Sequence, residues 1–299
     1  MSVRAWIEAF RLRTLPLALA SIGMGAFVAG ANGYFRWDIF LLCASTTVLL
    51  QILSNLANDY GDSIHGADHE GRTGPARMVQ TGQITMRQIR IALYLFVGLC
   101  LVSGITLLYV SFGWNLKGFL FFLFIGILAI LAALAYTAGR KPYGYMGLGD
   151  LSVVIFFGFV AVLGSYYLFA GHIKPILLLP ALSCGLFATG VLNVNNIRDI
   201  DSDKAAGKYS IPVRIGRKQA IRYHWFLLIA GMACAAAFTL IDFRSPWQFI
   251  YLISFPLFIR NGLAVSRLTE SSQLDPYLKQ LALSTLLFVL TFGLGLLIV

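Results

Sequence analysis

The stretch LKGFLFFLFIGILAILAALAY, residues 116–136, contains a single charged side chain, Lys117, in 21 positions. A helix that crosses the hydrocarbon core of a bilayer needs about 20 mostly apolar residues. The stretch meets this requirement, and it lacks the strict alternation of apolar and polar residues found in strands of membrane barrels. It therefore predicts one membrane-spanning α-helix.

Eight further apolar stretches of similar length lie on both sides of it. The chain of 299 residues is 58% hydrophobic and only 12% charged, whereas soluble domains carry about 25% charged residues. A soluble fold of this composition would expose large apolar patches. We therefore expect an all-α integral membrane protein, with one domain over residues 1–299 and nine transmembrane helices in a single bundle. The predicted spans are 15–31, 39–58, 89–110, 116–136, 151–170, 176–194, 220–241, 247–263 and 278–299.

The first span follows Arg11 and Arg13, an arrangement that also occurs in secretory signal peptides. However, Ser21, Gly25 and Ala29 form a stripe of small residues at every fourth position. Such a stripe is typical of helices that pack closely against other helices in membranes. We expect this segment to be a packed helix of the bundle.

Lysine and arginine residues are distributed unevenly between the two ends of the predicted bundle. With the N-terminus inside, 19 of the 23 basic residues fall on the inner side, and 11 of the 13 acidic residues fall there too. Positively charged loops face the cytoplasm. We therefore expect a multi-pass protein of the cell (inner) membrane, with a cytoplasmic N-terminus and an outer C-terminus. The net charge of +10 is explained by this topology and does not indicate nucleic-acid binding.

Two polar stretches on that face, residues 55–82 and 193–220, contain the same features in the same order. Each begins with asparagines spaced by three, continues with a matching pair of aspartates and ends on V-x-x-G before the next span. Four spans separate them, which predicts an internal pseudo-repeat that brings two half-sites together. The matching residues are Asn55, Asn58, Asp59 and Asp62 in the first stretch and Asn193, Asn196, Asp199 and Asp203 in the second.

The aspartate pairs have the spacing and the chemistry of metal ligands. Residues three or four apart lie on one face of a helix, so each pair presents two carboxylates together. Mg²⁺ prefers oxygen ligands and is commonly completed by water and substrate phosphates. We predict two Mg²⁺ ions held by Asp59, Asp62, Asp199, Asp203, Asn58 and Asn196.

Basic residues on the same face are suited to a diphosphate. Four aspartates offset two Mg²⁺ ions, which leaves roughly three negative charges of the diphosphate for arginine and lysine. Arginine gives planar two-pronged contacts to phosphate and lysine gives a point charge. We predict that Arg140 and Lys141 join the four aspartates in catalysis. The predicted diphosphate-binding residues are Asn55, Asn58, Arg72, Arg77, Asn196, Arg198 and Lys208.

Several motifs resemble those of the UbiA superfamily of membrane prenyltransferases. N-D-x-x-D at 58–62 and N-x-x-D-x-x-x-D at 196–203 are similar to its two aspartate-rich motifs. Y-x-x-x-R-K at 136–141 is similar to its Y-x-x-x-K-R, with the basic pair reversed. FRLRTLP resembles the opening of the family. NLANDYGD, TGPARMVQTG, KPYGYMGLGD and NNIRDIDSDKAAGK resemble the branch that acts on 1,4-dihydroxy-2-naphthoate.

The resemblance implies an enzyme that transfers a polyprenyl group from polyprenyl diphosphate to 1,4-dihydroxy-2-naphthoate with loss of CO₂, a step of menaquinone biosynthesis. The allylic C–O bond would ionise, and the electron-rich ring would attack the resulting cation. Aromatic side chains can shield such a cation through their ring faces. The candidates for this acceptor and cation pocket are Tyr136, Tyr143, Tyr145 and Asp150.

Two alternatives stay open at this point. The acceptor could instead be 4-hydroxybenzoate, a haem or a chlorophyllide, because acceptor choice depends on pocket shape. An ion-coupled transporter would also place carboxylates in a membrane, but its sites lie near the midplane on broken helices. Here the carboxylates lie at the ends of predicted spans, which favours the enzyme.

Overall fold

The structure is a computed structural model that describes residues 2–65 and 77–298, and every regular element in these ranges is helical. A helix satisfies its own backbone hydrogen bonds, which lipid cannot do for it. The α-helices are α1 (Val3–Phe10), α2 (Leu15–Ala31), α3 (Trp37–Ile64), α4 (Met86–Phe112), α5 (Leu116–Ala135), α6 (Gly149–Val153), α7 (Ser165–Ala170), α8 (Leu178–Arg198), α9 (Ile200–Ala205), α10 (Ile211–Ile241), α11 (Phe255–Arg267) and α12 (Asp275–Leu297). The 3₁₀ segments are η1 (Leu12–Thr14), η2 (Tyr143–Met146), η4 (Pro175–Leu177), η5 (Pro246–Ser254) and η6 (Ser271–Leu274), and η3 (Val154–Gly164) is a π-helix.

Nine helical stretches in the described part of the chain are long and apolar enough to cross a membrane, which confirms the predicted fold class. The bounds of α2 are the predicted ones. Helix α3 continues past residue 58 to Ile64, so Asp59 and Asp62 belong to the helix itself. Helix α10 begins at Ile211, ahead of residue 220, and breaks at Gly216, where φ is 77° and ψ is 160°.

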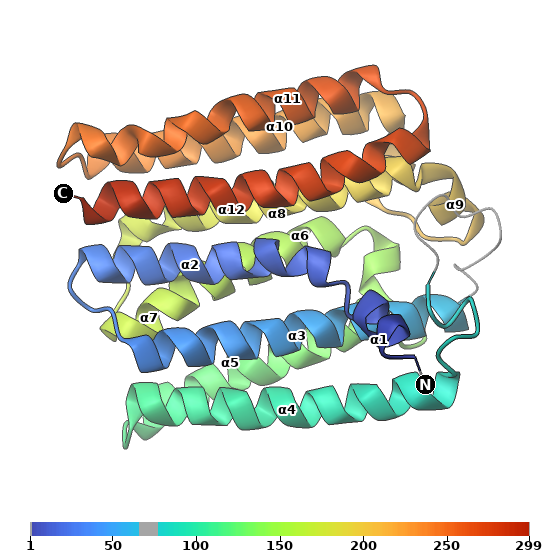
Figure 1. Ribbon diagram of the computed structural model, residues 1–299, viewed down its shortest axis with the longest axis horizontal. Coiled ribbons are helices and arrows are strands. Elements are labelled where there is room, and N and C mark those ends of the chain that lie inside the picture. The colour runs from blue at the N-terminus through green and yellow to red at the C-terminus, as the bar shows by residue number, and fades with distance from the viewer. Residues whose placement is uncertain (1, 66–76, 299) are drawn as a thin grey trace.

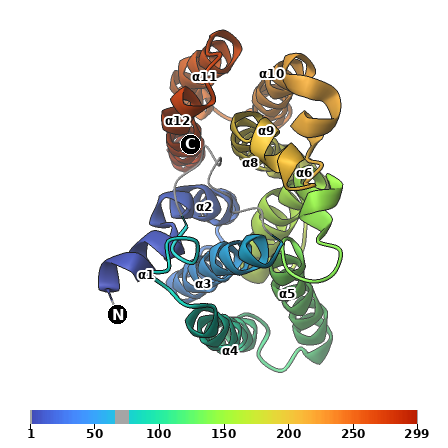
Figure 2. The ribbon, with the colours of Figure 1, turned by 90° about the vertical axis from the view of Figure 1, so that its right-hand side faces the viewer.

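The spans lie side by side in one bundle, and the two motif-bearing helices end at the same end of it (Figures 1 and 2). Helix α3 ends on the right of Figure 1, close to α1, and α8 leads there into α9. The N-terminus lies at this end and the C-terminus at the other. The fold therefore brings the described parts of the two polar stretches together at one end of the bundle, as the repeat predicted.

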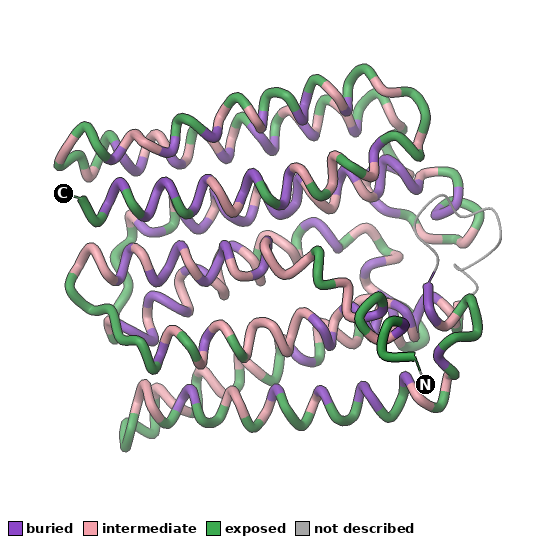
Figure 3. Tube along the Cα trace, viewed as in Figure 1, coloured by how far each residue is buried: buried purple, intermediate pink, exposed green. Residues whose placement is uncertain are grey.

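Burial is unequal among the spans (Figure 3). More than half of the most apolar window is buried in Ser271–Leu297 and in Pro175–Arg198, whereas only 6% is buried in α5. Among the residues of α5, Ile130 alone is buried, although the helix is almost entirely apolar. Exposed apolar side chains are stable in lipid, so the exposed outer side of α5 is suited to contact with the bilayer.

Close packing in the first half of the bundle depends on the small residues of α2. Ser21 and Ala29 are buried, and a Cβ atom at Gly25 would lie only 2.6 Å from the carbonyl oxygen of Val162. Only glycine permits α2 to approach the π-helix η3 this closely. The stripe of small residues therefore serves helix packing, as the sequence indicated.

Candidate active site

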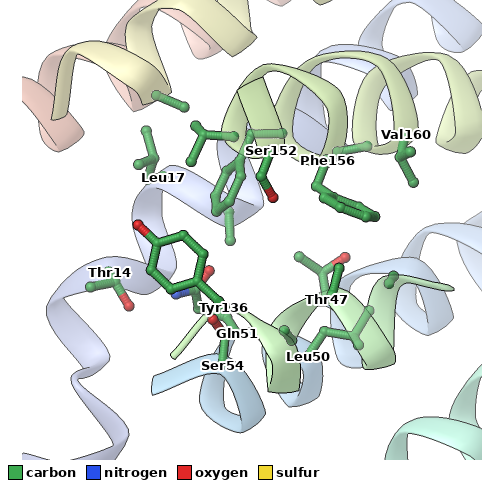
Figure 4. A pocket seen from close by; sticks show the side chains of 18 of the residues that line it. Thr14, Leu17, Thr47, Leu50, Gln51, Ser54, Tyr136, Ser152, Phe156 and Val160 are labelled. Carbon is green, nitrogen blue, oxygen red and sulfur yellow. The ribbon is translucent and has the colours of Figure 1, made fainter. Parts of the chain in front are cut away.

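A large cavity of about 730 Å³ reaches from the polar end of the bundle into its apolar interior. Its inner walls come from α2, α3, α5, η3 and α8, and Figure 4 shows Leu17, Leu50, Phe156 and Val160 around it. Its polar end carries both signs of charge. The charged residues that line it are Arg11, Arg13, Asp62, Arg77, Arg198, Asp199, Asp203, Lys208, Asp275 and Lys279.

The first aspartate pair lies on the last turns of α3 and is buried. Asp59 is 1% exposed and Asp62 is 3% exposed. Arg11 forms an ion pair with Asp59, and Arg77 forms one with Asp62 while its Nε lies 3.8 Å from Asp59. The hydroxyl of Tyr145 donates a 2.5 Å hydrogen bond to Asp62. Buried carboxylates require such partners, because an unpaired charge away from water is costly.

The second aspartate pair lies where α8 passes into α9. Asp199 ends α8, and its backbone oxygen accepts a 2.7 Å hydrogen bond from the backbone N–H of Asp203. Arg198 donates two hydrogen bonds to the Asp199 carboxylate, from Nε at 2.8 Å and from Nη2 at 2.7 Å. Lys208 lies 3.1 Å from Asp203. Both carboxylates line the same cavity as Asp62.

The three predicted asparagines play different parts in the structure. Asn55 donates hydrogen bonds to the backbone oxygen of Phe10 at 2.9 Å and to Thr14 at 3.0 Å, so its amide nitrogen anchors the chain ahead of α2. Asn55 also lines the cavity, and its role in binding the diphosphate stays a prediction. Asn58 accepts a hydrogen bond from Thr137 at 3.2 Å. Asn196 is 3% exposed, and its side-chain oxygen has no hydrogen-bond partner among the described residues.

The residues at this polar end fit a divalent cation that arrives with its substrate. The described residues contain no group of three His, Cys, Asp or Glu side chains that could hold an ion unaided. Mg²⁺ seldom uses such cages and is usually held by one or two carboxylates together with water and substrate phosphates. Burial raises the pKa of Asp203, and the carboxylates of Asp199 and Asp62 act in the same direction against Lys208. A cation would relieve this repulsion and would also satisfy the buried oxygen of Asn196.

The predicted basic residues divide into those that the structure brings to the cavity and those that it does not. Arg77 and Lys208 line the cavity beside the aspartates. Arg198 also lines it, with its guanidinium bound to Asp199, Asp275 and Asn195. Arg140 and Lys141 are exposed on the turn after α5 and do not line the cavity. Arg72 lies outside the described residues.

Of the four residues predicted for the acceptor pocket, two line the cavity and two do not. Tyr136 and Tyr143 line the cavity, with their rings edge to face and 5.3 Å apart between centroids. Tyr145 does not line the cavity, and its hydroxyl contacts Asp62. Burial, followed by the nearby Asp62 carboxylate, raises the pKa of Tyr145, so its hydroxyl keeps its proton and acts as a donor. Asp150 is 5% exposed and does not line the cavity.

Sequence reasoning missed four charged residues of the cavity. Arg11 and Arg13 were attributed to membrane orientation, and neither Asp275 nor Lys279 belongs to a recognisable motif. Arg11 has φ of 48°, the left-handed conformation, and is the only residue other than glycine with positive φ in the described chain. That conformation costs about 1–2 kcal/mol. The available signal was the pair of basic residues, Arg11 and Arg13, just before the first span.

Comparison with known proteins identifies the family of the chain. Residues 18–283 match the model described as the UbiA prenyltransferase family. The chain belongs to this family. Its relatives include a protein of Escherichia coli (strain K12) named 1,4-dihydroxy-2-naphthoate octaprenyltransferase, 45% identical over 98% of this chain and 94% of that protein. A Mycobacterium tuberculosis (strain ATCC 25618 / H37Rv) protein of the same name is 34% identical over 97% of this chain and 95% of its own.

Solved structures of UbiA homologues share the fold. The apo homologue from Aeropyrum pernix K1 has a TM-score of 0.70 at 18% identity and covers 97% of this chain and 98% of its own. The homologue from Archaeoglobus fulgidus bound to DMAPP and Mg²⁺ has a TM-score of 0.64 at 18% identity, over 96% of this chain and 99% of that one. At these identities the likeness is one of architecture.

Proposed function

We propose that this protein transfers a polyprenyl group from polyprenyl diphosphate to 1,4-dihydroxy-2-naphthoate, releasing diphosphate and CO₂ and yielding demethylmenaquinol. One observation carries the proposal: a single cavity joins a charged end to a long apolar interior. A polyprenyl diphosphate has the same division between a charged head and an apolar tail. The acceptor follows from the relatives that are 45% and 34% identical over nearly the whole chain.

Each part of the cavity has a task in this reaction. Asp59, Asp62, Asp199 and Asp203, with Asn58 and Asn196, would hold two Mg²⁺ ions, one at each motif. The chemistry that Mg²⁺ supplies when bound is compensation of the negative charge that builds on the departing diphosphate. The homologue bound to DMAPP and Mg²⁺ supports this choice of ion.

The basic residues of the chain would act on the same developing charge. Arg77 and Lys208 line the cavity and are placed to exchange a carboxylate partner for a phosphate oxygen. Contacts that strengthen as charge develops accelerate the reaction, because they favour the transition state over the ground state. Arg11, which pairs with Asp59 at the first motif, would be the third of these cations.

The allylic carbon would lie where the charged end meets the apolar wall. Tyr136 and Tyr143 line this part, and their ring faces can stabilise a carbocation. The apolar wall also excludes water, which would otherwise capture the cation as an alcohol. The electron-rich ring of the acceptor then forms the new C–C bond.

The bundle would be oriented with this site toward the cytoplasm in the cell (inner) membrane. The uneven distribution of lysine and arginine supports this orientation. The described parts of both polar stretches and the N-terminus lie at one end of the bundle and the C-terminus at the other, which agrees with the odd number of spans in the described residues.

The test uses purified protein in detergent with a polyprenyl diphosphate, Mg²⁺ and either 1,4-dihydroxy-2-naphthoate or 4-hydroxybenzoate. Product is identified by mass spectrometry. We expect a prenylated, decarboxylated naphthoquinol that disappears with EDTA and in Asp59→Asn and Asp203→Asn. Product from 4-hydroxybenzoate alone would overturn the acceptor. Absence of metal-dependent product from folded protein with either compound would overturn the proposed activity.

A further inference from the structure

Arg198 connects the second aspartate motif to the last span of the bundle. Its Nε and Nη2 bind the two carboxylate oxygens of Asp199, and Nη2 also donates to the side-chain oxygen of Asn195 at 2.9 Å. Its Nη1 forms an ion pair with Asp275, the first residue of α12. The Arg198 side chain is 2% exposed and that of Asp275 is 35% exposed. A buried arginine therefore has a carboxylate on either side.

The geometry of this group restricts the Asp199 carboxylate. A two-pronged contact between a guanidinium and a carboxylate fixes the plane of both groups, which a lysine contact does not. Asp275 holds the guanidinium from the opposite side, and Asp275 is itself fixed by α12. The neighbouring Leu274 is fully buried, so this end of α12 is firmly packed.

The charges of the group matter as much as its geometry. Arg198 carries one positive charge, whereas Asp199 and Asp275 together carry two negative charges, so the trio keeps a net charge of −1. Without the charge of Asp275, Arg198 and Asp199 would form a neutral pair. In a neutral pair the guanidinium would interact with Asp199 alone and would oppose a divalent cation at that carboxylate. When Asp275 shares the guanidinium, Asp199 attracts the cation more strongly.

We propose that Asp275 is a positioning residue for the second aspartate motif: through Arg198 it orients the carboxylate of Asp199 and preserves its negative charge for the metal–diphosphate complex. This inference rests on the proposed function, because it assigns Asp275 a role toward the ion held at Asp199. Arg198 is then part of the support of a ligand rather than a diphosphate ligand itself.

The test measures metal binding directly. Purified protein is saturated with geranyl S-thiolodiphosphate, an analogue that reacts poorly, and titrated with Mn²⁺ while free Mn²⁺ is followed by electron paramagnetic resonance. Asp275→Asn is expected to raise the Kd of Mn²⁺ about fivefold, which corresponds to weakening of one ion-pair contact. Asp275→Glu keeps the charge and is expected to stay within about twofold of the unaltered protein.

Asp242→Asn is the matched control. Asp242 pairs with Arg244 in the loop after α10, and its side chain is 35% exposed, the same as that of Asp275. We expect its Kd for Mn²⁺ to be unchanged. In turnover assays Asp275→Asn should need more Mg²⁺ for half-maximal rate while keeping its rate at saturating Mg²⁺, a split that a purely structural role would not produce.

The outcomes separate this inference from the proposed function. Unaltered protein that binds no Mn²⁺ with the analogue would overturn both. Tight binding that is equal in Asp275→Asn and the unaltered protein, or an equal rise in Asp242→Asn, would overturn the inference alone. Arg198→Lys is a second variant that keeps the charge and loses the two-pronged contact, so an unchanged Kd there would also count against positioning.

Discussion

The two aspartate motifs repeat in sequence, but the structure neutralises them in different ways. At the first motif the cations are distant along the chain: Arg11 lies 48 residues before Asp59, and Arg77 comes from a later part of the same polar stretch as Asp62. At the second motif Arg198 is adjacent to Asp199, and Lys208 lies five residues after Asp203. The first half-site is therefore assembled by tertiary packing, whereas the second forms largely from local sequence.

This difference has a consequence for stability. Changes at the first motif affect contacts that also hold α1, α3 and the following loop together, so activity and folding should fall together. Changes at the second motif should affect activity with less effect on folding. Asp275 is the exception there, since it adds one long-range contact to a local arrangement.

Arg77→Gln should give the largest effect. It leaves Asp62 without its guanidinium and weakens the support of Asp59, and breaking a buried ion pair from one side costs about 3–5 kcal/mol. Activity should fall about 10²–10³-fold because a cation facing the diphosphate is also lost. Thermal unfolding and product formation measure the two effects.

Lys208→Gln is the counterpart at the second motif. It removes a contact to one aspartate, whereas Arg77 faces both Asp59 and Asp62, so we expect about a tenfold loss of activity and a smaller loss in the free energy of unfolding than in Arg77→Gln. Equal destabilisation by the two substitutions would contradict the contrast between a packed and a local half-site.

Gly61→Ala should have the second-largest effect on activity, after Arg77→Gln. A Cβ atom there would lie 2.5 Å from the backbone carbon and oxygen of Thr137, so α3 must move away from the turn after α5. Overpacking of this kind costs about 1–3 kcal/mol. Because Asp62 is the next residue, activity should fall about 100-fold, as expected for a small misplacement of a reacting group.

Gly98→Ala serves as its control within α4, where an added Cβ atom meets nothing within 4 Å. We expect unchanged activity and an equal or slightly higher melting temperature, because alanine favours the helix by about 1 kcal/mol. Full activity in Gly61→Ala would show that the crossing of α3 with the α5 turn does not position the first motif.

Tyr145→Phe tests the support of the first motif and should have a smaller effect on activity than Gly61→Ala. It removes only the 2.5 Å hydrogen bond to Asp62, a bond to a charged group worth about 1.5–3 kcal/mol. Activity should fall about tenfold, with a higher requirement for Mg²⁺. Tyr94→Phe on the exposed face of α4 is the matched control and should have no effect.

Arg140→Gln and Lys141→Gln should have the smallest effects, less than about threefold each, because exposed charges are screened by solvent and salt. Kinetics at two ionic strengths would check this. A loss comparable to that of Arg77→Gln would restore the catalytic role that the sequence predicts for them.

The fold was predictable because it depends on apolar length, which a single sequence displays directly. Asp59, Asp62, Asp199 and Asp203 were also visible, since helical spacing places each pair together. Arg11 was not, because its partner lies 48 residues away and the contact requires the segment ahead of α2 to pack against the end of α3. Arg140 and Lys141 follow Gly139, whose φ of 98° belongs to a turn whose direction no spacing rule reveals, so their catalytic role stays a prediction.

The division of the cavity into a charged end and an apolar interior also bears on how the product departs. The substrate is held at its head by charges and along its tail by apolar side chains. The reaction removes the diphosphate, and with it the only part of the substrate that the bilayer could not solvate equally well. Lipid is as apolar as the cavity wall, so the finished quinol gains little by staying, and its release into the membrane needs no separate input of free energy.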